Sequence, residues 1–376
     1  MDQQTKVLLL IPHLGGGGAE KVITLLASQL SRQKYEVHLV VVTGSGTPPQ
    51  PGFPDLKLHL LGASRVRSSA FRLLALVRRL KPSVILSGMF HLNFLVLLLR
   101  PLFPRSTHVL VRQNGFLSAS LAMDKLPFSA RLFYRALYPR ADRVICQTQA
   151  MADDLLRTLG LKSERVVVLH NPLDIDALRA ELEPDLNQWS GPGPHLLAVG
   201  RLSQEKGFDL LLDAFASVRQ SFPGADLLIA GAGPEQAALN AQRERLGLQH
   251  AVRFAGHVDR PGRYFAGAAL FVLSSRHEGL PNALLEAAAC GLPIVALPAA
   301  GGIAGLLRNQ PGTWVASEVS APALTATLLL ALEGLKPVQR FAHAFLEPFK
   351  LDKAIHGYEA LIESVIQVSV REGPAS

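Results

Sequence analysis

Short runs of apolar residues, each about the length of one strand, alternate along the chain with stretches of helical length. The runs are continuous in Val, Ile and Leu, which is typical of strands covered on both faces of a parallel sheet. The predicted strands are KVLLLIP, EVHLVVVT, SVILSG, THVLVR and RVICQT in the first half, and HLLAVG, DLLIAG, VRFAGH, ALFVLSS and LPIVALP in the second. Each half therefore predicts a doubly wound α/β domain of Rossmann type.

The length of 376 residues also favours two domains. A stretch rich in Pro, Gly and polar residues separates the halves, so we expect a first domain at 1–175, a linker at 176–194 and a second domain at 195–350. The remaining segment, 351–376, predicts one helix with an apolar stripe. The stripe consists of Ile355, Tyr358, Leu361, Ile362 and Ile366.

Composition narrows the class of protein. With 48% hydrophobic and 18% charged residues the chain is not disordered, and a net charge of +8 favours anionic ligands. Its two cysteines, Cys146 and Cys290, are too few for a disulfide framework or a cysteine zinc site. No signal peptide is expected, and polar residues interrupt the one apolar stretch of membrane-spanning length, 84–103. We therefore expect a cytoplasmic protein.

A glycine loop follows the first predicted strand. Four consecutive glycines, including Gly16, Gly17 and Gly18, stand between the strand and a helix in PHLGGGGAEKV. Such a loop lets the backbone approach a ligand, and the helix N-terminus favours an anion or an oxyanion-like sugar group. The alternative is a merely tight turn, which needs fewer glycines. The loop is neither a Walker A motif nor a GxGxxG fingerprint.

Two cations bracket the loop after the strand HLLAVG. Arg201 and Lys206 stand in VGRLSQEKGFDLLLDAF, between that strand and an amphipathic helix. An arginine and a lysine that converge on one anion form a phosphate clamp, although isolated surface cations are usually only solvated. Their position at the carboxyl end of a strand favours the clamp.

Two carboxylates lie in the stretch SRHEGLPNALLEAAACGLPIVA. Glu278 precedes a turn and Glu286 lies inside an apolar helix, where burial disfavours an acid. Glu286 could accept hydrogen bonds from a ribose diol, and Glu278 from hydroxyls of a sugar. Peptide N–H groups between them can face a phosphate. Together with the two cations, the acids predict a site for a nucleoside diphosphate with an attached sugar. The donor-binding candidates beside them are Gly279, Leu280, Pro281 and Asn282.

These motifs resemble those of family 4 glycosyltransferases. GGGGAEKV, LHNPLDID, the block around Arg201 and the block around Glu286 stand in the order and spacing of that family. The resemblance implies the GT-B fold, with two Rossmann-like domains facing each other across a cleft and a final helix that crosses back to the first domain. It also implies that Arg201 and Lys206 bind the donor diphosphate, Glu278 the transferred sugar and Glu286 the ribose, with Glu278, Arg201 and Lys206 as the catalytic set.

The resemblance further implies a retaining, metal-independent transferase without a cofactor. It would move a sugar from a nucleotide-sugar, UDP-linked by expectation, to a glycan or lipid-linked acceptor in bacterial polysaccharide, lipopolysaccharide or glycolipid biosynthesis. Two alternatives stay open on the same fold. One is a UDP-N-acetylhexosamine epimerase, and the other is a sugar-nucleotide-binding partner without turnover.

Two positions depart from the family pattern. Gln113, followed by Asn114, stands where many members have a histidine, and Gly305 in GGIAG replaces a carboxylate. Gln113, Asn114 and His13 are the candidates for contacts on the acceptor side.

Basic segments with apolar stripes occur twice in the first half, at 65–82 and 125–143. Helical periodicity allows an ordinary crossover helix with a solvated basic face. The functional alternative is peripheral contact with an anionic membrane, on the inner face of the cytoplasmic membrane. No nucleic-acid-binding motif accompanies the charge, so we expect no nucleic-acid partner.

Overall fold

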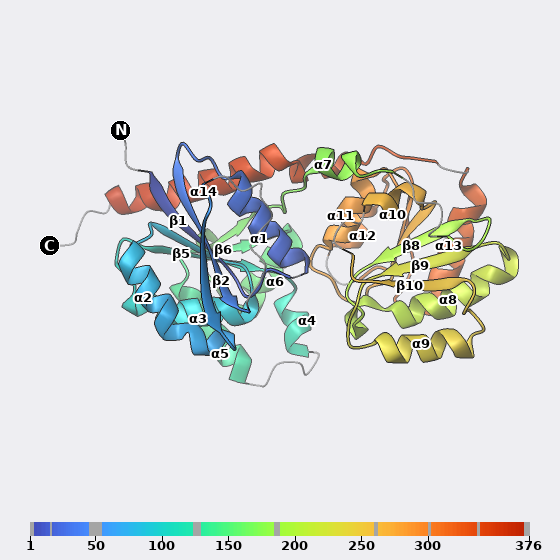
Figure 1. The fold of residues 1–376 in the computed structure, drawn as a ribbon, viewed down its shortest axis with the longest axis horizontal. Helices are drawn as coiled ribbons and strands as arrows, with labels where there is room; N and C mark the ends of the chain where they lie inside the picture. The colour runs from blue at the N-terminus through green and yellow to red at the C-terminus, as the bar shows by residue number, and fades with distance from the viewer. Residues whose placement is uncertain are drawn as a thin grey trace. The chain divides into compact units, whose positions relative to one another are not determined.

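The computed structural model describes residues 4–15, 17–44, 55–122, 129–183, 189–258, 262–299, 302–336 and 339–371. The chain forms two compact units, the first from Met1–Pro172 and Leu351–Ser376 and the second from Leu173–Lys350. Each unit has one parallel sheet with helices on both faces (Figure 1). The predicted α/β class with two Rossmann-like domains is confirmed.

The sheet of the first unit has seven strands within the described ranges, all parallel, in the order β3-β2-β1-β4-β5-β6-β7. The order reverses between β1 and β4, which is the switch point where doubly wound sheets bind ligands at their carboxyl ends. The strands are β1 (Thr5–Ile11), β2 (Tyr35–Thr43), β3 (Lys57–Ala63), β4 (Val84–Ser87), β5 (His108–Gln113), β6 (Arg143–Cys146) and β7 (Val166–Val168).

Side chains alternate between the two faces of this sheet and build two cores. Leu8 and Leu10 of β1 belong to one core, and Val7 and Leu9 to the other. The first core is covered by α2 (Ala70–Leu80), α3 (Phe90–Leu99), α4 (Leu117–Ala122), α5 (Ser129–Leu137) and α6 (Gln149–Leu159). The second core is covered by α1 (Gly18–Gln29) and α14 (Leu351–Arg371).

The second unit repeats this plan with the strand order β10-β9-β8-β11-β12-β13. These strands are β8 (His195–Val199), β9 (Asp226–Ala230), β10 (Val252–Gly256), β11 (Leu270–Leu273), β12 (Ile294–Ala296) and β13 (Thr313–Val315). One face carries α8 (Phe208–Ser221), α9 (Gln236–Arg245) and α13 (Ala321–Gly334). The other carries α7 (Ile175–Ala180), α10 (Gly262–Gly267), α11 (Asn282–Ala289) and α12 (Ile303–Leu307).

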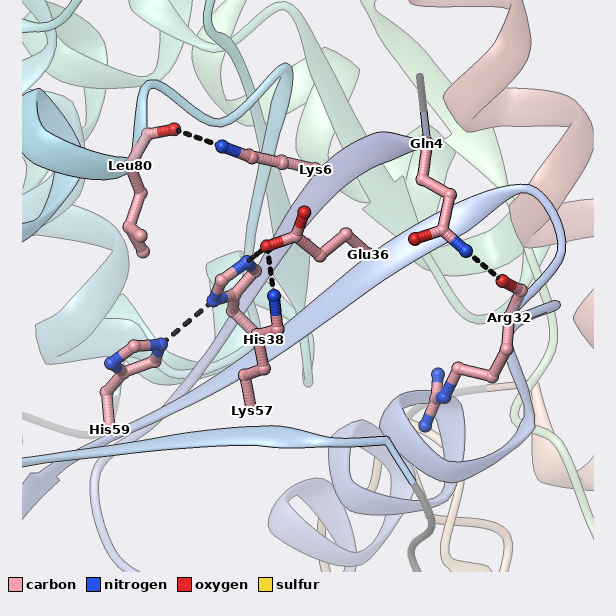
Figure 2. Close-up of polar contacts among 8 residues, drawn as sticks. All are labelled: Gln4, Lys6, Arg32, Glu36, His38, Lys57, His59 and Leu80. Atoms are coloured by element: carbon pink, nitrogen blue, oxygen red, sulfur yellow. Dashed lines mark hydrogen bonds and ion pairs between the residues drawn. The ribbon is translucent and has the colours of Figure 1, made fainter. Parts of the chain in front are cut away.

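The ten predicted strands are present, and the three that the pattern missed are β3, β7 and β13. All three lie at sheet edges and are largely half-exposed. β7 and β13 are only three residues long, and polar or glycine residues interrupt the apolar residues of β3, so all three give a weaker pattern than a longer strand covered on both faces. A polar cluster joins β3 to β2, in which His38 contacts both Glu36 and His59 (Figure 2).

The segment expected as a linker, 176–194, does not separate the two units. Its described residues belong to the second unit, and residues 184–188 lie outside the described chain. The first part forms α7, and Leu178, Leu182 and Trp189 pack against the core of that unit. The Pro- and Gly-rich composition suggested a loose connection, but these apolar side chains hold the segment on the domain.

The final helix, α14, belongs to the first unit. Its buried Tyr358 and Ile362 share a core with β1 and β2, and Glu359 Oε1 accepts a hydrogen bond of 2.9 Å from the backbone N–H of Ser31. The chain thus returns to its first unit after completing the second, as the resemblance implied.

In the described parts of the chain we find no helix with the length and apolarity needed to cross a bilayer. The apolar stretch 84–103 forms β4 and α3, the strand and helix that its polar interruptions predict.

Candidate functional site

The candidate donor site lies at the carboxyl ends of β8 and β11. These two strands are neighbours in the second sheet. Arg201 and Lys206 follow β8, and Glu278 follows β11. Parallel neighbours end on the same edge of a sheet, so the two loops lie side by side.

Lys206 and Glu278 pair directly with each other. The lysine ammonium forms an ion pair with Oε1 of Glu278, across 72 positions of sequence. Ser275 Oγ donates a second hydrogen bond, of 2.7 Å, to the same oxygen. The Lys206 side chain is 21% exposed and that of Glu278 is 12% exposed, so both can still be reached from solvent.

Further contacts fasten the turn that contains Lys206 to the loop after β11. Ser274 Oγ donates to the Lys206 carbonyl at 2.9 Å, and the backbone N–H of Arg276 donates to the Glu205 carbonyl at 2.8 Å. Gly207 has φ +63°, and a Cβ there would lie 2.1 Å from the Ser274 carbonyl oxygen. Only glycine allows this close approach.

An arginine–carboxylate pair also joins the loop after β11 to the first turn of α8. Arg276 donates to both carboxylate oxygens of Asp209, each at 2.6 Å. Partial burial opposes ionisation of Asp209, but the hydrogen bonds from Arg276 lower its pKa overall. The same bonds raise the pKa of Arg276. Sequence reasoning missed this pair because its members are 67 positions apart.

Arg201 is exposed, and its guanidinium makes no hydrogen bond or ion pair within the chain as described. The backbone of its loop packs closely against two glycines after β9. A Cβ at Gly231 would lie 1.8 Å from the Gly200 carbonyl oxygen, and one at Gly233 would lie 2.3 Å from that of Leu202. The Gly-Ala-Gly sequence at the end of a predicted strand was the available signal for this support.

The helix α11 begins at Asn282, directly after the segment Glu278–Pro281. Its N-cap, Pro281, makes no side-chain hydrogen bond to the first turn. Glu286 is half-buried on a helix whose neighbouring residues are buried. Its charge and burial together raise the pKa of the Cys290 thiol to about 12, with burial the larger cause. The acid therefore lies at the boundary of the apolar core and not inside it.

The glycine loop precedes α1. Gly17 and Gly18 are exposed, and Gly16 lies outside the described residues. A Cβ at Gly15 would meet nothing within 4 Å, and one at Gly17 would meet only the Glu20 carboxylate, at 3.8 Å. The packing of the protein itself therefore gives no reason for glycine at these positions, which leaves close approach of a ligand as an explanation.

Glu20 is a residue of this loop that sequence reasoning missed. It stands in the first turn of α1, is 5% exposed, and lies 3.7 Å from Nε2 of the exposed His13. A carboxylate at this position partly offsets the positive end of the helix. The loop is consequently better suited to hydroxyl groups than to a phosphate.

Gln113 and Asn114 use their side-chain amides inside the first unit. Gln113 donates to the Gly115 carbonyl at 2.9 Å and accepts from Tyr138 at 2.8 Å. Asn114 donates to the Gly88 carbonyl, and its Oδ1 accepts from Arg112 at 2.7 Å. Both amides thus hold the loop after β5, with the buried Arg112 beside them.

Gly305 lies in α12, and a Cβ there would meet nothing within 4 Å. Space therefore does not explain why a glycine replaces the carboxylate of the family pattern. The structure gives no other reason for it.

Two family models match the chain. The model described as Glycosyltransferase Family 4 matches residues 16–177, and the model described as Glycosyl transferases group 1 matches residues 193–333. One match lies in each half of the protein, and the second contains the candidate donor site.

Two relatives extend across most of the chain. A Campylobacter jejuni protein, N-acetylgalactosamine-N,N'-diacetylbacillosaminyl-diphospho-undecaprenol 4-alpha-N-acetylgalactosaminyltransferase, is 26% identical over 77% of this chain and 80% of its own. The amylovoran biosynthesis glycosyltransferase AmsD of Erwinia amylovora is 27% identical over 90% of this chain and 93% of its own.

Among solved structures, Anabaena HepE in complex with UDP and glucose resembles the whole chain. The TM-score is 0.79 at 19% sequence identity, and the match covers 96% of this chain and 100% of the other. At this level of identity the likeness concerns the fold.

Proposed function

Because the chain is a member of glycosyltransferase family 4 with the GT-B fold, we propose that it is a retaining enzyme that transfers a sugar from a UDP-sugar to a glycan or lipid-linked acceptor. Relatives named for lipid-linked oligosaccharide, amylovoran and lipopolysaccharide core synthesis support this class of acceptor. HepE complexes with UDP and with UDP-glucose support the donor.

The observation that carries the proposal is the arrangement of charge at β8 and β11. Arg201 offers a guanidinium that is unpaired over the described ranges, while Lys206, in the same loop after β8, forms a partly exposed pair with Glu278. We assign the diphosphate to Arg201, Lys206 and the backbone N–H groups of 279–283, and the sugar hydroxyls to Glu278. Glu286 takes the ribose. A guanidinium gives paired donors to phosphate oxygens, and helix N-termini favour anions.

In the proposed reaction the bond between the anomeric carbon and the diphosphate oxygen breaks. The acceptor oxygen forms its bond on the same face of the sugar, and its proton passes to the departing diphosphate. The enzyme contributes positioning and stabilisation of the negative leaving group by fixed cations, without a divalent metal or other cofactor. The alpha linkage in the name of the Campylobacter relative is consistent with retention.

We further propose that the first unit binds an anionic membrane surface through α3 and α5. These helices contact each other and expose Leu98, Leu132 and Phe133, at 58%, 70% and 54%. Arg131 and Arg135 of α5 are exposed beside them. Apolar side chains flanked by arginines suit the boundary between headgroups and acyl chains. Residues 125–128 of the predicted basic segment lie outside the described chain.

The test is a transfer assay with a panel of UDP-sugars and an extract of bacterial lipid-linked glycans. The glycans are supplied in vesicles with or without anionic phosphatidylglycerol, and products are identified by mass spectrometry. We expect UDP and a new α-glycosidic bond, undiminished by EDTA and faster on anionic vesicles. Replacement of Phe133 by Ser should remove the vesicle effect.

Other outcomes separate the alternatives. A changed UDP-sugar without a new glycosidic bond would identify an epimerase. Nucleotide binding without any reaction across the panel would indicate a binding partner without turnover. An inverted β-linkage would contradict retention, and equal rates on both kinds of vesicle would contradict the membrane surface.

A further inference from the structure

The two carboxylate oxygens of Glu278 have different surroundings. Oε1 accepts from Lys206 Nζ and from Ser275 Oγ, the latter at 2.7 Å. Oε2 has no hydrogen bond or ion pair to any residue in the described ranges. Two donors nearly saturate one oxygen, so a ligand hydroxyl must bind the other.

Among the described residues, the Ser275 hydroxyl has no hydrogen-bond partner other than Glu278. Ser275 lies two positions after the end of β11, is 1% exposed, and its hydroxyl has the Glu278 carboxylate as its partner. Burying a hydroxyl costs free energy unless it forms a hydrogen bond, and a bond to a charged acceptor is among the stronger kinds. A serine at this point therefore stabilises one orientation of the carboxylate.

Lys206 alone would not define that orientation. An ammonium group is a point charge with three rotatable donors and can follow either carboxylate oxygen. Ser275, by contrast, lies three positions from Glu278 on a short loop, and its neighbour Ser274 fixes the carbonyl of Lys206. The pair of serines thus connects both ends of the ion pair to the end of one strand.

We propose that Ser275 is a positioning residue that directs Oε2 of Glu278 toward the hydroxyls of the transferred sugar. This rests on the proposed function, because it takes Glu278 as the sugar-contacting acid. Ser275 then acts on the sugar portion of the donor and leaves the nucleotide portion unaffected. Specificity for the sugar depends on which oxygen faces it, and not only on the presence of an acid.

The substitution Ser275→Ala separates the two portions of the donor. Calorimetry with UDP, UDP-glucose and UDP-N-acetylglucosamine gives the affinities, and the transfer assay gives kcat and KM. We expect UDP affinity to change less than about twofold, while kcat/KM for the accepted UDP-sugar falls about tenfold, the loss of one hydrogen bond to a charged group. Ser69→Ala, which removes a buried serine hydroxyl in the first unit, should leave both unchanged.

A second variant keeps the inference testable if Ser275→Ala folds poorly. In Glu278→Gln the two donors retain the amide oxygen, so the NH2 group replaces Oε2 and cannot accept a hydrogen bond. This variant should bind UDP at least as tightly as the wild type, because Lys206 no longer neutralises a carboxylate, but lose the sugar-dependent part of donor affinity. Unchanged kcat/KM in Ser275→Ala, a parallel loss of UDP affinity, or full sugar-dependent affinity in Glu278→Gln would overturn the inference. If the wild type itself bound no UDP-sugar, the proposed function would fail instead.

Discussion

Arg201 and Lys206 carry the same charge but stand in different surroundings. The Arg201 guanidinium is exposed and unpaired over the described ranges, whereas Lys206 is bound to Glu278. A cation that already neutralises a carboxylate has less potential left for an anion. Arg201 is therefore the main diphosphate ligand in our assignment, and Lys206 also serves the sugar-binding acid.

Replacing Arg201 by Ala should weaken UDP binding by about ten- to a hundredfold, the loss of a charge-assisted hydrogen bond or somewhat more. Because its side chain is exposed and forms no hydrogen bond or ion pair with the described residues, the melting temperature should not change. Isothermal titration with UDP measures the effect. Arg245→Ala, at an exposed position on α9, is the matched control and should bind UDP like the wild type.

At the scale of elements, the pairing of β2 with β3 creates an acid-sensitive cluster (Figure 2). His38 is 1% exposed, and its two ring nitrogens contact Glu36 and His59 at 2.9 Å each. Burial lowers the pKa of His38 even though Glu36 opposes the shift. Burial and the neighbouring His38 lower the pKa of His59. Both rings therefore bind protons less readily in the folded sheet than free imidazoles do.

The sign of the pH effect follows from proton linkage. Above the ordinary histidine pKa of 6.5 both the folded and unfolded rings are neutral, so pH has no effect through them. Below it the unfolded rings bind protons before the folded ones, and the first unit loses stability, by at most about 1.4 kcal/mol per pH unit for each proton.

Denaturant unfolding at about pH 7.5 and about pH 5.5 should show this loss, and His59→Gln should reduce it. His250→Gln, at an exposed position of the second unit, should leave the pH dependence as it is. An identical pH dependence in His59→Gln and the wild type would argue against the cluster as its source.

At the scale of the whole molecule, the chain crosses between its units twice. It enters the second unit at Leu173 and leaves it at Lys350, and these crossing points are joined by a hydrogen bond of 2.9 Å from the Leu173 N–H to the Phe349 carbonyl. α14 then completes the first unit. The first unit is consequently discontinuous in sequence and needs α14 to complete its core.

Ile362→Ala should lower the free energy of unfolding of the first unit by about 2–5 kcal/mol, because it leaves a cavity between α14 and the sheet. Chemical denaturation followed by circular dichroism measures the change. Leu330→Ala on α13, where the side chain is 61% exposed, should change stability by no more than about 0.5 kcal/mol. Equal stabilities of the two variants would show that α14 contributes little to this core.

The sequence by itself determined the central strands of both sheets, the two-domain class and the loops that carry the candidate site. These features depend on local patterns, namely apolar runs such as KVLLLIP and polar residues placed directly after them. The apolar stripe of 351–366 likewise predicted a helix with a buried face. The stripe alone did not show which domain the helix packs on; the resemblance implied the first, and the tertiary structure joins it there.

Tertiary structure alone decided which side chains meet. Glu278 pairs with Lys206 because β8 and β11 are neighbours in the sheet, although 72 positions separate the two residues. Gln113 and Asn114, predicted as acceptor-side residues, accept hydrogen bonds from Tyr138 and Arg112 within the first unit. Strand order and burial are set by the free energy of the whole packed domain, and no local pattern in the chain records them.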